Sequence, residues 1–164
     1  VFDNHLVENL QVVFLVIAAV LSAYYAKKFS QYPLDVYVRV FLVFFALAFG
    51  LRELDIDTII AGEFGKQIEN VLRLIVGIPF LLFIGFLLTK IKFLWQTRMA
   101  VLRSPVFHFV VAGCLCYVIG WPFDKKVFAS LTFEQCQVVE EILEFWGTAL
   151  IMLGASWKFP ISRQ

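Results

Sequence analysis

Five long apolar stretches, separated by short polar connections, constrain the fold of this chain more than any other feature. A helix needs about 20 residues to cross the hydrocarbon core of a bilayer, and each stretch approaches that length. The chain of 164 residues is 61% hydrophobic and 16% charged. Soluble domains are typically about 45–50% apolar and about 25% charged. The sequence therefore predicts an integral membrane protein.

The expected fold is an all-α bundle of five transmembrane helices, in a single domain over residues 1–164. The apolar stretches and their charged ends place these helices at about residues 6–26, 35–60, 67–89, 105–121 and 135–157. Pro33 favours a helix start and Gly62 favours the end of the second helix. Thr132, with Gln135 three residues later, resembles a capping box at the start of the fifth helix.

Basic residues set the expected orientation of the bundle. Most of the 14 Lys and Arg residues fall around the first connection, in Lys90–Arg103 and near the C-terminus. Five spans put these segments on one side, which the positive-inside rule makes cytoplasmic. The N-terminus is then extracytoplasmic and the C-terminus cytoplasmic, in a bacterial inner membrane or a plasma membrane. Trp95 and other apolar residues within the basic stretch predict that it lies on the membrane surface.

The acidic residues are distributed even more unequally. Of the 13 Asp and Glu residues, Asp35 alone falls on the cytoplasmic side of this topology. Acids contribute little to membrane topology, so insertion does not require this bias. A group of carboxylates on the extracytoplasmic side is therefore the main functional indication in the sequence.

The stretch Gly50–Asp57 is the expected centre of this group. The apolar run before it, Val40–Leu51, is too short to span a bilayer, so the helix is expected to continue through the charges to Ile60. This would bring Arg52, Glu53 and Asp57 to membrane depth or its edge. Ionisable groups there usually face a bundle interior, a partner charge or water.

Three other helices are expected to bring charged residues to the same membrane level. Within each of these helices the charged residues are three or four positions apart, so they lie on one face. These residues are His5 and Glu8 in the first helix, Glu69 and Arg73 in the third, and Glu140, Glu141 and Glu144 in the fifth. Arg52 and Arg73 can neutralise two of the acids. The remaining carboxylates must protonate, reach water or bind a cation.

We interpret this group as a cation site. Carboxylate oxygens are the ligands that hard divalent metal cations prefer, whereas two histidines are too few for a three-histidine zinc site. The predicted ligands are Glu53, Asp57, Glu141 and Glu144, supported by Glu8, Glu140 and His5, with Arg52, Arg73 and Glu69 balancing charge. The expected function is metal handling, cation-coupled transport or metal-assisted chemistry on a lipid-borne substrate. The cofactor would be a divalent metal cation.

Two other interpretations remain open at this point. The charges could form an interfacial ion-pair network of Arg52 and Arg73 with Glu53, Glu69 and Glu144, the other acids being solvated. The chain could also be a non-catalytic subunit that docks another membrane subunit, or a second copy, through its charged outer helix ends. The net charge of +1 gives no basis for nucleic-acid binding.

Two smaller expectations concern packing. Asp35 and Arg39, four residues apart at a helix start, predict a pair on the surface. The glycines of the third, fourth and fifth helices predict close helix packing, because small residues let helix backbones approach in a membrane.

Overall fold

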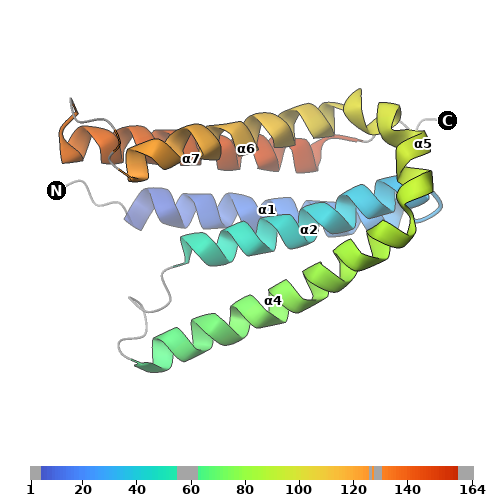
Figure 1. Ribbon diagram of the computed structural model, residues 1–164, viewed down its shortest axis with the longest axis horizontal. Helices are drawn as coiled ribbons and strands as arrows, with labels where there is room; N and C mark the ends of the chain where they lie inside the picture. The colour runs from blue at the N-terminus through green and yellow to red at the C-terminus, as the bar shows by residue number, and fades with distance from the viewer. Residues whose placement is uncertain (1–4, 55–62, 126, 128–130, 159–164) are drawn as a thin grey trace.

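The computed structural model describes residues 5–54, 63–125, 127 and 131–158, and over these residues the fold is all-helical (Figure 1). The helices, in chain order, are α1 (His5–Lys28), α2 (Pro33–Glu53), α4 (Glu63–Thr89), α5 (Ile91–Leu102), α6 (Pro105–Asp124) and α7 (Phe133–Ser156). Four of them, α1, α2, α4 and α6, are long and apolar enough to cross a membrane. The predicted all-α class is confirmed, and these four helices indicate a membrane protein.

The long helices run back and forth, so that two ends of the molecule collect different charges (Figure 1). α6 packs along α7, and α1 packs along both α2 and α7. α4 packs on α2 but diverges from the other helices, and α5 turns across the far end towards α6. We call the end where α2 ends and α4 begins the acidic end, because Glu8, Glu53, Glu69 and Glu144 lie on the helix segments there.

The largest difference from the predicted helix bounds is at the end of α2. Leu54 is extended, with φ −85° and ψ 101°, and its N–H donates to the Gly50 carbonyl at 3.1 Å. The predicted continuation to Ile60 is therefore wrong at Leu54, and residues 55–62 lie outside the described part of the chain. α2 does not need the extension, because its 21 residues from Pro33 onward rise about 30 Å.

The other bounds are close to those predicted. α4 begins at residue 63 rather than 67, and α6 continues to residue 124 rather than 121. The predicted capping box at α7 is confirmed: Thr132 Oγ1 accepts from the Gln135 N–H at 3.3 Å, and Gln135 Oε1 accepts from the Thr132 N–H at 3.0 Å. The basic stretch predicted to lie on the membrane surface is helical as α5, and none of its described residues is buried.

Gly113 and Gly147 bring α6 and α7 into backbone contact. A Cβ atom at Gly113 would lie 2.6 Å from the Gly147 carbonyl oxygen and 2.8 Å from Ile151 Cγ1. A Cβ at Gly147 would lie 2.9 Å from the Gly113 carbonyl oxygen. The predicted close packing is confirmed at these two positions, whereas Gly77 and Gly85 face open space. Such contacts matter because apolar burial gives no hydrophobic gain between helices surrounded by lipid.

A buried ion pair connects three helices at the end opposite the acidic end. Asp35 and Arg39 of α2 are both 0% exposed, with Arg39 Nε 3.5 Å from Asp35 Oδ1. Arg39 also donates to the carbonyls of Ala155, at 2.5 Å, and Trp157, and its guanidinium lies 4.9 Å from the Tyr25 ring centroid. The predicted surface pair is therefore wrong. The last carbonyls of α7 have no partner within their helix, and Arg39 satisfies them.

Replacing Gly113 with Ala should lower the free energy of unfolding by about 1–3 kcal/mol, because overpacking would push α6 away from α7. Gly85→Ala is the matched control, since a Cβ there meets no atom within 4 Å. SDS titration of the purified protein in mixed micelles measures both. Equal free energies of unfolding for the two variants would show that the close approach of α6 to α7 at Gly113 does not contribute to stability.

Arg39→Met should destabilise the protein by about 3–5 kcal/mol, because it leaves Asp35 as an unpaired buried charge. The double variant Asp35→Asn/Arg39→Met should recover part of this loss. Arg98→Met on α5, where the guanidinium is exposed, is the control and should have little effect. Thermal melts followed by circular dichroism compare the variants, and an Arg39→Met melt matching that of Arg98→Met would contradict the assignment.

Candidate functional site

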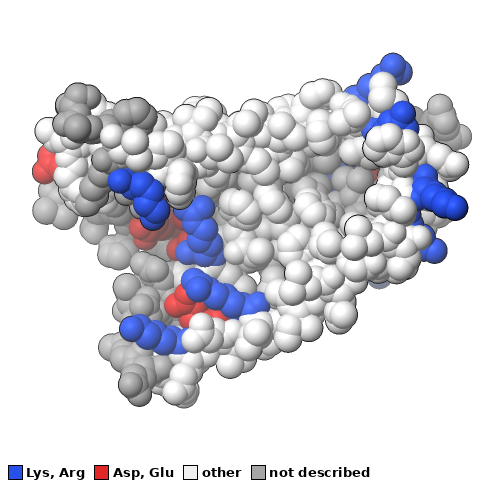
Figure 2. Space-filling view, viewed as in Figure 1, with Lys and Arg blue, Asp and Glu red and all other residues white. Residues whose placement is uncertain are grey.

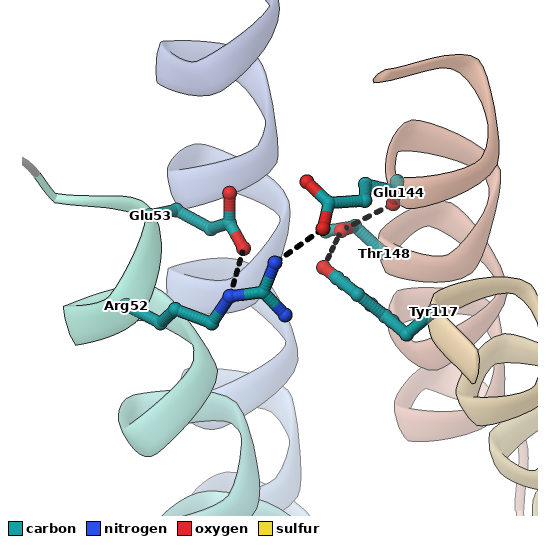
Figure 3. A network of polar contacts seen from close by, with 5 residues as sticks. All are labelled: Arg52, Glu53, Tyr117, Glu144 and Thr148. Atoms are coloured by element: carbon teal, nitrogen blue, oxygen red, sulfur yellow. Dashed lines mark hydrogen bonds and ion pairs between the residues drawn. The ribbon is translucent and has the colours of Figure 1, made fainter. Parts of the chain in front are cut away.

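The candidate site is a polar cluster at the acidic end, with Arg52 at its centre (Figure 3). The Arg52 guanidinium lies between Glu53, the next residue of α2, and Glu144 of α7. Its Nη2 donates to Glu144 Oε1, and its Nε lies 3.7 Å from Glu53 Oε1. The two carboxylates are 7% and 13% exposed, whereas Arg52 is 53% exposed. The acids are therefore buried behind an arginine that still reaches the surface.

The last turn of α2 explains why these neighbours face different helices. Successive residues of a helix point about 100° apart, so Arg52 reaches towards α7 while Glu53 turns towards α1. The Gln11 side chain of α1 is 1% exposed. With its amide oriented by the hydrogen-bond network, it donates to Glu53 Oε2 at 2.9 Å and accepts from the Phe145 N–H of α7 at 3.2 Å. Gln11 thus connects α1, α2 and α7.

Two hydroxyl groups support the cluster from α6 and α7 (Figure 3). Thr148 Oγ1 donates to the Glu144 carbonyl at 2.8 Å. The Thr148 hydroxyl has one proton, and this bond to the Glu144 carbonyl uses it. In the 2.5 Å contact between the two hydroxyl groups, Tyr117 is therefore the donor and Thr148 Oγ1 the acceptor. The Tyr117 ring centroid lies 5.3 Å from the Arg52 guanidinium carbon, which is cation–π distance. α6 therefore contributes to holding Arg52 although it carries none of the acids in this cluster.

Further acids lie close to Glu53. Glu144, Arg52, Glu8 of α1 and Glu140 of α7 lie within electrostatic range of Glu53. Three acids and one base thus act on a carboxylate that is also largely shielded from solvent. Figure 2 shows Asp and Glu side chains at this end of the molecule, most of them beside Lys or Arg, whereas basic side chains predominate at the opposite end.

The structure separates some of the predicted site residues from this cluster. Glu141 lies within electrostatic range of Glu8 and Glu144, at the periphery of the cluster. The predicted pair of Glu69 and Arg73 is confirmed, with Arg73 Nη2 donating to Glu69 Oε1. This pair lies on the diverging helix α4, so Glu69 is not part of the cluster.

Two predicted ligands cannot be placed. Asp57 and the side chain of His5 lie outside the described part of the chain. Among the described side chains, no three His, Cys, Asp or Glu residues are grouped as a metal site. The ion pairs of Arg52 with Glu53 and Glu144, and of Arg73 with Glu69, agree with the interfacial network that the sequence left open.

Sequence reasoning missed Gln11, Tyr117 and Thr148. Helical spacing could have indicated two of them, because Gln11 follows Glu8 by three residues and Thr148 follows Glu144 by four, each on one face. Tyr117 has no charged neighbour one turn away on its own helix. Its role follows only from the approach of α6 to α7 through Gly113 and Gly147.

Comparisons of the chain with protein-family models, curated proteins and solved structures gave no significant match. The function is therefore argued from the chemistry of the cluster. Its carboxylates can accept protons or bind cations, and its guanidinium, amide and phenol groups donate hydrogen bonds. An arginine that is about half exposed can also bind an anion on its open side.

Arg52→Ala should lower the free energy of unfolding by about 1–3 kcal/mol, because it removes the charge-assisted hydrogen bond to a largely buried Glu144 and the positive charge beside Glu53. Adding Glu53→Gln should restore part of the loss, since it removes one of the two carboxylates left without Arg52. A double-mutant cycle in SDS unfolding measures this coupling. Additive effects of the two changes would mean that Arg52 does not stabilise Glu53.

Proposed function

We propose that this chain is a multi-pass membrane protein that binds a cation at its acidic end, with Glu53 and Glu144 as central ligands. The observation that carries the proposal is the environment of Glu53, where three acids and one arginine act on a carboxylate that is 7% exposed. In the described part of the structure, Glu53 Oε1 also has no hydrogen-bond donor. A bound cation would bind this oxygen and offset the negative charge of a largely buried carboxylate.

The proposal includes α7 as a fifth span. Its 24 residues rise about 36 Å, as much as the equally long α1, and it packs along α6 through Gly147 and Gly154. Its four acids all lie in its first half, and its second half carries no charge. With five spans, the basic residues place the acidic end and the N-terminus outside the cytoplasm and the C-terminus inside.

Oxygen ligands from three helices suit a hard divalent cation. Glu8 and Glu140 lie within electrostatic range of Glu53, and Glu141 within that of Glu144, so we propose all three as further oxygen donors. His5, three residues before Glu8 in the sequence, and Asp57, four residues after Glu53, are proposed as the remaining ligands. Metal handling, cation-coupled transport and metal-assisted chemistry on a lipid-borne substrate all require that the cation binds first.

Elemental analysis of the protein, purified without chelator and then equilibrated with Mg²⁺, Ca²⁺, Mn²⁺ or Fe²⁺, should find a stoichiometric metal. The double variant Glu53→Gln/Glu144→Gln should lose it, because both central ligands lose their charge. Glu134→Gln is the matched control, since Glu134 is an exposed acid in the first turn of α7. Failure of all three proteins to bind metal, with no change of thermal midpoint on metal addition, would refute a divalent cation site.

A membrane subunit is the second candidate, and α4 is the observation that favours it. None of the most apolar part of α4 is buried within this chain. A partner helix could cover this face, with the charged ends of α2 and α4 setting the register. In that case the double variant should release a co-purifying protein while its metal content stays the same as that of the wild type.

A further inference from the structure

A groove between α2 and α4 lies beside the cluster and has Arg52 in its lining. Its volume is about 390 Å³, and its lining is Ala48, Leu51, Arg52, Arg73, Val76 and Gly77. Figure 2 shows the hollow between the two groups of charged side chains at this end. Figure 1 shows that α2 and α4 are farther apart at the acidic end than at the opposite end, which leaves room for the groove.

The charges in the lining are both positive. Arg52 and Arg73 are 53% and 57% exposed, and each donates through one Nη2 atom to one glutamate, Glu144 or Glu69. A guanidinium carries five N–H donors in a planar fork, so each arginine can donate to a second group without leaving its glutamate. Two arginines facing one groove can therefore bind a phosphate group from both sides.

We propose that the groove binds the phosphate of an anionic phospholipid, with the lipid chains running along its apolar residues. The rest of the lining is apolar, and both α2 and α4 are candidate membrane spans. A groove between two spans opens to the bilayer, where lipid phosphates are abundant and the chains can follow Leu51, Val76 and Gly77. This site shares Arg52 with the proposed cation site but differs from it in requiring Arg73, which pairs with Glu69 of its own helix.

Gly77 provides a way to block the groove without disturbing the fold. A Cβ at Gly77 would meet no atom within 4 Å, although the residue lines the groove. A leucine there would extend into the space that the lipid is proposed to occupy. Gly85, on the same helix, also has open space around its Cβ but does not line the groove. Gly77→Leu and Gly85→Leu therefore form a matched pair.

Native mass spectrometry of the detergent-purified protein, titrated with phosphatidylglycerol or with the diacylglycerol of the same chains, tests the proposal. The wild type should retain one phosphatidylglycerol and discriminate against the lipid that lacks the phosphate. Arg73→Gln should weaken retention of phosphatidylglycerol by about tenfold, the effect of losing one charge-assisted hydrogen-bonding group. Gly77→Leu should weaken retention of both lipids, and Gly85→Leu should behave as the wild type.

Three results would overturn the proposal. One is equal retention of the two lipids by the wild type, and another is wild-type retention of phosphatidylglycerol by Arg73→Gln. The third is displacement of the lipid by millimolar inorganic phosphate, which would make the groove a site for soluble anions. Circular dichroism checks the helicity of each variant. Arg73→Lys, which keeps the charge but loses the planar fork, replaces Arg73→Gln if that variant does not fold, and it should give intermediate retention.

Discussion

Two arginines of α2 hold α7, one at its C-terminal end and one near its middle. Arg39 donates to the carbonyls of Ala155 and Trp157, and Arg52 donates to Glu144. In a bilayer a charged group has no water to return to, so its partners must come from the protein. The two arginines thus connect helices that share little direct contact, since α1 and α6 provide most of the packing along α7.

The two arginines differ in what their partners leave open. Arg39 is fully buried, and its acceptors are the terminal carbonyls of a helix, which suits a structural role. Arg52 is about half exposed, and its acceptors are carboxylates among other acids. A site that must admit an ion or a lipid needs this second kind of arrangement, in which a charge is held but not enclosed. This contrast is the reason for placing function at the acidic end and stability at the other.

Local patterns in the sequence predicted local structure well. The capping box at Thr132 and the pair of Glu69 with Arg73 depend on spacing within one helix, and both are present. The burial of Arg39 could not be predicted in this way, because it depends on where the last turn of α7 lies relative to α2. With Arg39 at the surface, the apolar run that begins at Val40 is too short to span a bilayer, and for this reason the sequence predicts a helix beyond Leu54. The burial of Arg39 removes the need for that extension.

The same distinction applies to the candidate site. Spacing grouped Glu140, Glu141 and Glu144 on one helix and brought Glu8 and Glu53 to the same level, because charge at a membrane edge is visible in the sequence. The spacing of residues could not show which carboxylate each arginine pairs with, because the pairing depends on the rotation of each helix about its axis. The role of Tyr117 depends on the backbone contact of Gly113 with Gly147, which sets the distance between α6 and α7.

Arg52 lies on the boundary between the proposed cation site and the proposed lipid groove, and this position links them. On one side its guanidinium offsets the charge of Glu53 and Glu144, and on the other it lines the groove with Arg73. A phosphate in the groove would offset part of the positive charge of Arg52 and make the electrostatic potential at the carboxylates more negative. Cation binding would then become more favourable, and by thermodynamic reciprocity a bound cation would favour the lipid to the same degree. One arginine between two sites of opposite charge is sufficient for such coupling, with no movement of the helices.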